Sequence, residues 1–324
     1  MSFLSCDWGS TSFRLRLIAN GEIVEERTRN AGATTITADL QPETPESRRQ
    51  AFSTVLKSEI SKLQSSTQAR LPDVPIVISG MATSAHGWKE LPYAGTPLGL
   101  DGSDLISSQE TFHDEQDNRH PLFLISGVRT KDDVMRGEEC EIIGLMNADR
   151  WRHYTSSCRI VMPGTHSKHV RIRDNCLTGF CTYMTGELFD LLSRRSVLAK
   201  TVDTDGSEVV ADEAFRDGVS RSATAGLVTS LFRTRTNGLF NRLSPDQNAN
   251  FLSGLLIGEE LKHLHEAADT ETVLLCAPQP LSSLYETAAA ELDVPSLHIV
   301  PPSQVRTLSV RGHRSFLNSV GREE

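Results

Sequence analysis

Hydrophobic and polar positions along this chain follow two different periods, which together predict an ordered series of strands and helices. In the stretch 13–17, Phe and Leu alternate with Arg, which is the period-two pattern of a half-buried strand. A short mixed run at 2–6 precedes it, and EIVEERT at 22–28 follows a Gly turn, so three strands open the chain. Apolar residues at helical spacing then predict a helix over Ser47–Gln64.

Two apolar runs later in the first half read as buried strands. They are VPIVISG at 74–80 and HPLFLISG at 120–127, each ending in Gly. A polar stretch at 107–119 lies between them. The segment DVMRGEECEIIGLM at 133–146 then leads into a helix.

After about residue 150 the same order begins again. Strands are predicted at 158–164, 167–173, 176–186, 271–277 and 294–300, and helices at 248–268, 280–292 and 303–320. The helix at 248–268 is the clearest, and Asn248 or Asn250 is a plausible N-cap for it.

The restart is visible in the residues themselves. A shift of 155 positions places CDWGSTSFRLRL, beginning at Cys6, over VMPGTHSKHVRI, beginning at Val161. Gly9 then meets Gly164, and apolar positions of the two following strands coincide. We therefore expect two mixed α/β domains, at 1–150 and 151–324, each opening with a strand, a polar turn and a strand.

Two such turns can face each other across a cleft and hold phosphate oxygens with backbone N–H groups and hydroxyls. The residues proposed for this role are Gly9, Ser10, Thr11 and Ser12 in the first turn, and Gly164, Thr165, His166 and Ser167 in the second. Asp7, at the end of the first strand, can hold Mg²⁺ directly or through water. The chain has no G-x-x-x-x-G-K-[ST] motif and no G-x-G-x-x-G after a strand, so the single-loop nucleotide folds are disfavoured.

Composition narrows the class of protein further. The 324 residues are 38% hydrophobic and 23% charged, as in a globular protein, and the net charge of −9 disfavours a general nucleic-acid binder. No apolar run is long enough to span a membrane, and the start of the chain lacks the pattern of a signal peptide, so a cytoplasmic location is expected. The six Cys show no zinc spacing, and most are expected to be buried as reduced thiols.

Six motifs, taken together and in order, resemble the 2-dehydro-3-deoxygalactonokinase family of the sugar kinase/Hsp70/actin superfamily. They are DWGSTSFR (7–14), GMATSAHGWKELPY (80–93), DVMRGEE (133–139), MPGTHSKHV (162–170), MTGELFDLL (184–192) and FLSGLLIGEE (251–260). The resemblance implies ATP-dependent phosphorylation of the 6-hydroxyl of 2-dehydro-3-deoxy-D-galactonate, in galactonate degradation. It also implies two ribonuclease-H-like (actin-like ATPase) domains with the active site in the cleft between them, and the last helix is a candidate to pack back on the first domain.

The first half would then carry the sugar acid, the metal and the base. Related sugar kinases place an acidic residue at the start of the helix after the last strand of this domain, and here that position holds MRGEE. Glu138 is the preferred base, with Glu139 and Asp133 as alternatives, and Glu139 is also a candidate substrate contact. Arg136 could bind the substrate carboxylate through its guanidinium, or pair with a neighbouring Asp on the surface. The sugar pocket would use Ser84, Trp88 and Tyr93.

The second half would carry the nucleotide, with Lys168 adding a positive charge near the transferred phosphoryl group. Two positions depart from the family pattern. His169 stands where Trp is usual, and is expected to be a polar surface residue. Pro278 stands where a Gly is usual in the turn at 274–285, which would contact adenosine through Ala277 and Gln279.

Two other functions fit the same fold. A nucleotide or sugar-acid sensor would keep the turns and lose efficient catalysis, which the departure at Pro278 motivates. A phosphohydrolase would hold phosphate in both turns while water attacks. In each case we expect a small-molecule partner, neither nucleic acid nor membrane, and a homodimer as a candidate assembly.

Overall fold

A computed structural model describes residues 2–38, 40–41, 43–204, 208–264 and 271–321. The chain divides into two compact units. Unit 1 consists of Met1–His153 and Thr307–Glu324, and unit 2 is Tyr154–Arg306. The repeat in the sequence predicts a division of the chain after residue 150. In the structure the end of the chain returns to unit 1 as helix α11 (Leu308–Val320). The predicted cleft between the domains stays a prediction.

A six-stranded sheet forms the centre of unit 1. In order across the sheet, its strands are β3 (Glu22–Arg29), β2 (Phe13–Ala19), β1 (Phe3–Trp8), β4 (Ile76–Gly80), β8 (Arg119–Ile125) and β7 (Ser107–His113). The pairs β1–β2, β2–β3 and β7–β8 are antiparallel, whereas β1–β4 and β4–β8 are parallel. The carboxyl ends of β1, β4 and β8 therefore lie at one edge of the sheet.

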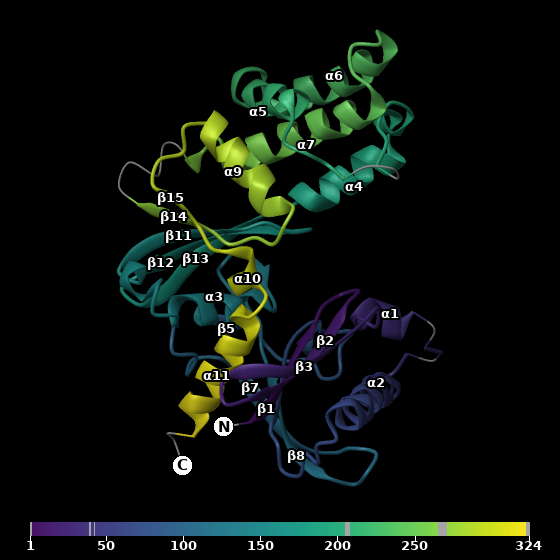
Figure 1. The fold of residues 1–324 in the computed structure, drawn as a ribbon, viewed down its shortest axis with the longest axis vertical. Coiled ribbons are helices and arrows are strands. Elements are labelled where there is room, and N and C mark those ends of the chain that lie inside the picture. The colour runs from purple at the N-terminus through teal and green to yellow at the C-terminus, as the bar shows by residue number, and fades with distance from the viewer. Residues whose placement is uncertain (1, 39, 42, 205–207, 265–270, 322–324) are drawn as a thin grey trace. The chain divides into compact units, whose positions relative to one another are not determined.

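The alternation of side chains along β1 decides what each face of this sheet carries. Leu4, Cys6 and Trp8 point into the core under α2 (Pro45–Thr67), which a capping box at Thr44 begins. Ser5 and Asp7 belong to the opposite face, where α11 packs on α3 (Glu138–Met146). Figure 1 shows α2 on one side of these strands and α11 on the other.

Shorter elements complete unit 1. They are α1 (Ala33–Thr37), the 3₁₀ helices η1 (Met81–Thr83) and η2 (Arg152–Tyr154), which runs across the boundary to unit 2, and the two-residue strands β5 (Ala94–Gly95), β6 (Leu98–Gly99), β9 (Val128–Arg129) and β10 (Val134–Met135). Strand β7 lies in the polar stretch 107–119, where the apolar pattern predicted no strand. It is an edge strand with a single buried residue, Phe112. Its sequence therefore lacks the alternation of apolar and polar residues that marks a strand facing the core.

Unit 2 repeats the same order of strands. They are β13 (Cys176–Tyr183), β12 (Ser167–Arg173), β11 (Ser157–Met162), β14 (Thr272–Leu275) and β15 (Leu297–Ile299), with the first pairs antiparallel and the last two parallel. This order corresponds to β3-β2-β1-β4-β8 in unit 1, so the predicted pair of mixed α/β folds is confirmed. The helices are α4 (Thr185–Arg195), η3 (Val197–Lys200), α5 (Glu213–Ala225), α6 (Leu227–Leu239), α7 (Pro245–Leu261), α9 (Leu281–Glu291) and α10 (Pro302–Val305).

The start of α7 corrects one prediction. The helix begins at Pro245 after the N-cap Ser244, whose hydroxyl accepts the N–H of Gln247. Asn248 and Asn250 are therefore inside the helix, and the Asn248 amide donates to the carbonyls of Thr201 and Thr234. The predicted last helix at 303–320 is also divided, into α10 and α11.

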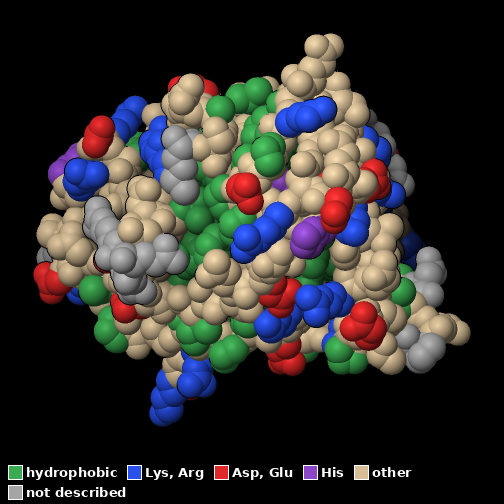
Figure 2. Space-filling view, turned by 90° about the horizontal axis from the view of Figure 1, so that it is seen from below, with side chains coloured by type: hydrophobic (Ala, Val, Ile, Leu, Met, Phe, Trp, Pro, Cys, Tyr) green, Lys and Arg blue, Asp and Glu red, His purple; other side chains and the backbone are tan. Residues whose placement is uncertain are grey.

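The surface charges and the Cys residues of the structure agree with what the composition predicts. On the face of the molecule in Figure 2, acidic and basic side chains lie interspersed. In the described part of the chain, no helix combines the length and the apolar character needed to cross a bilayer. All six Cys are free thiols, and four of them are buried, as predicted: Cys6, Cys140, Cys158 and Cys276.

Candidate functional site

The first polar turn lies between β1 and β2. Trp8 pairs with Phe13, so residues 9–12 form the turn, and its Ser and Thr side chains are exposed. The turn is held from behind by the segment that begins α1. The N–H groups of Gly32 and Ala33 donate to the carbonyls of Thr11 and Gly9, at 2.9 and 3.0 Å. A Cβ on Gly32 would lie 2.3 Å from the backbone of Ser10, so only Gly allows this approach.

Asp7 is the second-to-last residue of β1, close to this turn and on the face that carries α3. Its side chain is 31% exposed, and Oδ2 lies 3.7 Å from Nη1 of Arg14. Partial burial raises the pKa of Asp7, Arg14 opposes this shift, and the nearby Glu138 carboxyl adds to it. The Asp7 carboxylate is thus accessible to solvent at the carboxyl edge of the sheet.

The acidic residues that begin α3 have different environments. Glu138 is half-buried, and its Oε2 accepts the N–H of Arg136 at 3.0 Å. Glu139 is 0% exposed, and both of its oxygens turn back to the N–H of Gly137, at 2.8 and 2.9 Å. Burial, with help from Glu138, raises the pKa of Glu139 to about 8. Because Glu139 is enclosed and both of its oxygens face the backbone, it is less suited than Glu138 to the base role in which it was an alternative, and its predicted contact with the substrate stays a prediction.

Asp133, the remaining alternative, lies before β10. Its carboxyl accepts the N–H of Val134 at 2.7 Å. A fourth acid, Glu141, was not among the predicted site residues, and burial, together with Asp7, raises its pKa to about 8. Glu141 follows Glu138 by three residues and so shares its side of α3. That helical spacing was the signal that could have identified it.

Arg136 lies under the loop that was predicted to form the sugar pocket. Its Nη1 donates to Thr83 Oγ1 at 2.5 Å, its Nη2 donates to the carbonyl of Leu91 at 3.3 Å, and the guanidinium stacks on Tyr93 with Cζ 4.2 Å from the ring centroid. The surface pairing with Asp132 or Asp133 is therefore not the arrangement found. Arg136 connects Tyr93 to the start of α3.

The other two predicted sugar-pocket residues differ in exposure. Ser84 is half-buried, and its hydroxyl donates to the carbonyl of Met81 at 2.8 Å. Trp88 is 5% exposed and packs in the core against Phe112, with ring centroids 5.9 Å apart. The prediction of Trp88 as a sugar contact is corrected, because its ring belongs to the support of the loop.

The second polar turn lies between β11 and β12 and is one residue longer than the first. Met162 pairs with Lys168, which leaves residues 163–167 as the turn. The start of α4 holds it. The N–H of Glu187 donates to the carbonyl of Thr165 at 3.0 Å, and a Cβ on Gly186 would lie 2.6 Å from the carbonyl oxygen of Gly164. Each turn is thus closed by a glycine in the segment that begins the following helix.

The side chains of the second turn separate into exposed and buried ones. Thr165 and His166 are exposed, and His166 Nε2 lies 2.5 Å from Oε2 of Glu187. Ser167 is fully buried, so the expectation that its hydroxyl meets phosphate is corrected. Lys168 is largely buried, and its Nζ donates to the carbonyl of His166 at 3.0 Å, so its charge lies at the turn.

The expectation that His169 is a surface residue is wrong. The side chain is buried, its Nε2 lies 2.9 Å from Oε1 of the buried Glu260, and its ring packs on Tyr183 with centroids 4.5 Å apart. Because β12 is an inner strand, its residues alternate between two covered faces.

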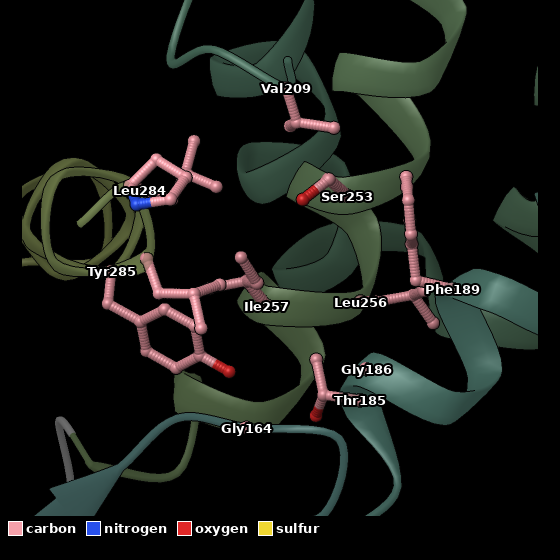
Figure 3. A pocket seen from close by; sticks show the side chains of 12 residues that line it. Gly164, Thr185, Gly186, Phe189, Val209, Ser253, Leu256, Ile257, Leu284 and Tyr285 are labelled. Carbon is pink, nitrogen blue, oxygen red and sulfur yellow. The ribbon is translucent and has the colours of Figure 1, made fainter. Parts of the chain in front are cut away.

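A pocket of about 320 Å³ lies directly beside the second turn. Gly164, Thr185 and Gly186 form one end, and Figure 3 shows the hydroxyls of Tyr285 and Thr185 directed to that end. Its remaining walls are mainly apolar side chains of α4, α7 and α9, namely Phe189, Leu256, Ile257, Leu281 and Leu284. Its volume and character suit the apolar part of a small organic ligand.

The predicted adenosine contacts lie outside this pocket. Ala277 is buried in the core, and Gln279 is exposed, with its Oε1 accepting the hydroxyl of Ser283 at 2.9 Å. Among the described residues that line the pocket, Pro280, Leu281, Leu284 and Tyr285 belong to the segment 274–285. The residues of this segment that line the pocket therefore come slightly later in the sequence than the predicted Ala277 and Gln279.

The fold and the two turns define a class before any sequence is compared. Two α/β units with matching strand orders, each with a polar turn after its first strand, are typical of actin-like sugar kinases. The crystal structure of a Sinorhizobium meliloti protein, described as a candidate 2-dehydro-3-deoxygalactonokinase, superimposes with a TM-score of 0.78 at 30% identity, covering 97% of this chain and 96% of that one. A Clostridium difficile activator of 2-hydroxyisocaproyl-CoA dehydratase, with a TM-score of 0.51 at 13% identity and full coverage of this chain, shares the fold.

Sequence comparison specifies the family. The model of the 2-keto-3-deoxy-galactonokinase family matches residues 7–308. A protein of Rhizobium meliloti (strain 1021), named as a probable 2-dehydro-3-deoxygalactonokinase, is 34% identical over 292 residues, which is 88% of each chain. The 2-dehydro-3-deoxygalactonokinase of Escherichia coli (strain K12) is 30% identical over 293 residues, again 88% of each chain. The chain belongs to the 2-keto-3-deoxy-galactonokinase family and is a sugar-acid kinase, a phosphotransferase.

Proposed function

We propose that this protein transfers the γ-phosphoryl group of MgATP to the 6-hydroxyl of 2-dehydro-3-deoxy-D-galactonate. The observation that carries the proposal is the apolar pocket of unit 2 that ends at Gly164 of the second polar turn. Such a pocket suits the base and ribose of a nucleotide, and the turn beside it suits the phosphates. The matches to kinases named for this sugar acid, over 88% of the chain, supply the acceptor.

In unit 2, the exposed turn binds phosphate through its backbone. The N–H groups of Thr165 and His166 are in the exposed part of the turn, and Lys168 Nζ adds a positive charge at the carbonyl of His166. The apolar side chains of Leu256, Ile257 and Leu284, on α7 and α9, would hold the adenosine. In unit 1, residues 9–12 offer the second set of N–H groups and hydroxyls.

Asp7 is the proposed magnesium ligand. In the described part of the chain, no group of three or more His, Cys, Asp or Glu side chains is arranged to hold a metal ion. A single carboxylate with phosphate oxygens and water is how Mg²⁺ binds in many phosphoryl-transfer sites, and the half-exposed Asp7 fits that donor set. When bound, Mg²⁺ supplies charge neutralisation on the phosphate oxygens.

Glu138 is the proposed base. Glu138 and Glu141 are half-buried whereas Glu139 is enclosed, and the N–H of Arg136 orients Oε2 of Glu138. Its carboxylate accepts the proton of the attacking 6-hydroxyl as the oxygen–phosphorus bond forms and the bond to ADP breaks. Arg136 holds Tyr93 and the loop at 81–93 against α3, where the sugar acid binds.

The test is ADP release from ATP and Mg²⁺ with a panel of sugar acids. Release that depends on 2-dehydro-3-deoxy-D-galactonate, with a phosphorylated product at C6 by NMR, is the expected result. Nucleotide binding by calorimetry without ADP release for any 2-dehydro-3-deoxy aldonate would replace the kinase with a sensor. ADP release in the absence of sugar acid would instead indicate a phosphohydrolase.

A further inference from the structure

A network of buried polar side chains lies under the second turn, and its centre is Glu260 of α7. The Glu260 carboxylate is 1% exposed and has three hydrogen-bond partners. Oε2 accepts the hydroxyls of Tyr285, at 2.7 Å, and of Thr185, while Oε1 lies 2.9 Å from Nε2 of His169. A carboxylate buried this completely is costly without donors, and here donors come from three different elements.

The direction of the hydrogen bonds follows from counting protons. The Tyr285 hydroxyl has a single proton, which it donates to Glu260, so its oxygen must accept the proton of Ser167, 3.1 Å away. Ser167 Oγ is then left as the acceptor for the N–H of Gly164, at 3.3 Å. Burial and Glu260 raise the pKa of Tyr285 well above its usual value, so the hydroxyl keeps its proton. The chain of bonds therefore runs in one direction, from Gly164 to Glu260.

The same network joins four of the segments around the nucleotide pocket. Tyr285 is on α9, Thr185 begins α4, Gly164 is in the turn, and Glu260 is on α7 one turn beyond Ile257. Tyr285, Thr185 and Gly164 line the pocket themselves, and Figure 3 shows both hydroxyls at the end where Gly164 lies. One carboxylate thus connects the phosphate turn to the helices that form the apolar walls.

We propose that Glu260 and Tyr285 are positioning residues for the nucleotide: they fix the second phosphate turn relative to the walls of the adenosine pocket. The inference rests on the proposed function, because it takes this pocket as the nucleotide site. Glu260 is enclosed and acts through Tyr285, Ser167 and Gly164. The named members of the network all belong to unit 2.

The experiment compares Tyr285→Phe and Glu260→Gln with the wild type. Tyr285→Phe keeps the pocket wall and removes the hydroxyl, whereas Glu260→Gln keeps the shape and replaces one acceptor oxygen with a donor. We expect the Kd of MgADP, measured by calorimetry, and the KM for ATP to rise about tenfold to a hundredfold. The KM for the sugar acid should stay within about threefold, because its binding groups are elsewhere. Thr185→Val should act in the same direction, and Thr185→Ser should restore wild-type affinity.

Glu286→Gln is the matched control, since it removes the same charge from an exposed position beside Tyr285 on α9. A purely structural role would lower the thermal midpoint and the active fraction, but leave the Kd of the folded molecules unchanged. Unchanged MgADP affinity in folded Tyr285→Phe would overturn the inference, even where Glu260→Gln does not fold. The double variant Tyr285→Phe/Ser167→Ala should lose little more affinity than Tyr285→Phe, because both changes interrupt one chain.

The two proposals fail in different ways. Wild-type protein that binds MgADP but does not phosphorylate the sugar acid would remove the proposed reaction, and the calorimetric comparison would still decide the role of Glu260. Wild-type protein that phosphorylates the sugar acid while all network variants keep normal nucleotide affinity would remove only the positioning role. Absence of any nucleotide binding by the wild type would contradict both.

Discussion

Nδ1 of His313, on the last helix of the chain, lies 2.8 Å from the hydroxyl of Ser5, on the first strand. Nε2 of the same ring lies 2.9 Å from the hydroxyl of Ser79, on β4. The ring is fully buried, and burial, together with the nearby Arg16, lowers the pKa of His313 to about 3. A neutral imidazole therefore attaches α11 to two adjacent strands, at the face of the sheet that carries Asp7.

The buried, neutral His313 should stabilise the fold less in acid than at neutral pH. The unfolded chain protonates His313 near pH 6.5 and the folded chain only near pH 3, so the unfolded state binds more protons between these values. The contribution of His313 to the free energy of unfolding should fall as the pH falls from about 6.5 towards 3, by on the order of a few kcal/mol at ~1.4 kcal/mol per pKa unit. Glu139 and Glu141, whose pKa values are raised to about 8, contribute with the opposite sign above about pH 4.5. Denaturant titrations across this range measure it.

The variant His313→Gln tests the cause of this acid sensitivity. It should be less stable at pH 7, by ~1–3 kcal/mol for the disturbed buried hydrogen bonds, and this difference from the wild type should shrink as the pH falls from 6.5 towards 3. His113→Gln, at an exposed position of unit 1, is the control and should keep the wild-type slope. An unchanged slope in His313→Gln would show that another group controls the acid limb.

Glu138 and Glu139 form a matched pair for testing the base. Glu138→Gln should lower kcat ~10²-fold or more and leave ATP binding near normal, because the proton acceptor is lost and the nucleotide site is not. Glu139→Gln should lower kcat less than tenfold, because that carboxyl is already protonated at neutral pH. Steady-state kinetics of both variants give the answer, and equal losses would remove the distinction between them.

Asp7→Asn should weaken the response to magnesium. The amide is a poorer ligand for a hard cation than the carboxylate, so the Mg²⁺ concentration for half-maximal activity should rise ~10-fold or more. Arg14→Gln removes the partner at 3.7 Å and keeps the carboxylate, so it should change this concentration much less. Mg²⁺ titrations at saturating ATP and sugar acid measure both, and an unshifted Asp7→Asn curve would exclude Asp7 as the ligand.

Arg136→Lys should raise the KM for the sugar acid by ~10-fold and leave the KM for ATP unchanged. Lysine cannot bond Thr83 and Leu91 together while stacking on Tyr93, so the loop at 81–93 loses its support. Initial rates with each substrate varied in turn separate the two constants. A rise in the KM for ATP alone would place the effect of Arg136 at the nucleotide and contradict its role under the loop.

Local patterns predicted much of the fold and part of the candidate site. Burial of a strand decides which of its positions are apolar, and this produces the period of two in β2 and the apolar run in β4. Both strands can therefore be predicted from the sequence. The polar edge strand β7 was missed, because an edge strand with one buried position has no such period. The cap of α7 was misplaced because Ser244 with Pro245 and Gln247 precedes the apolar stretch used to locate the helix.

The sequence by itself determined the two α/β folds, the repeated strand–turn–strand and the family, since these depend on order and spacing along the chain. Only the tertiary structure decided which polar residues face solvent. Glu138 and Glu139 are adjacent in sequence, yet one is accessible and the other buried, because a helix turns successive side chains by about 100°. His169 and Glu260 are hydrogen-bonded across 91 positions, and His313 reaches Ser5 across 308, and such distant pairings exist only once the chain is packed.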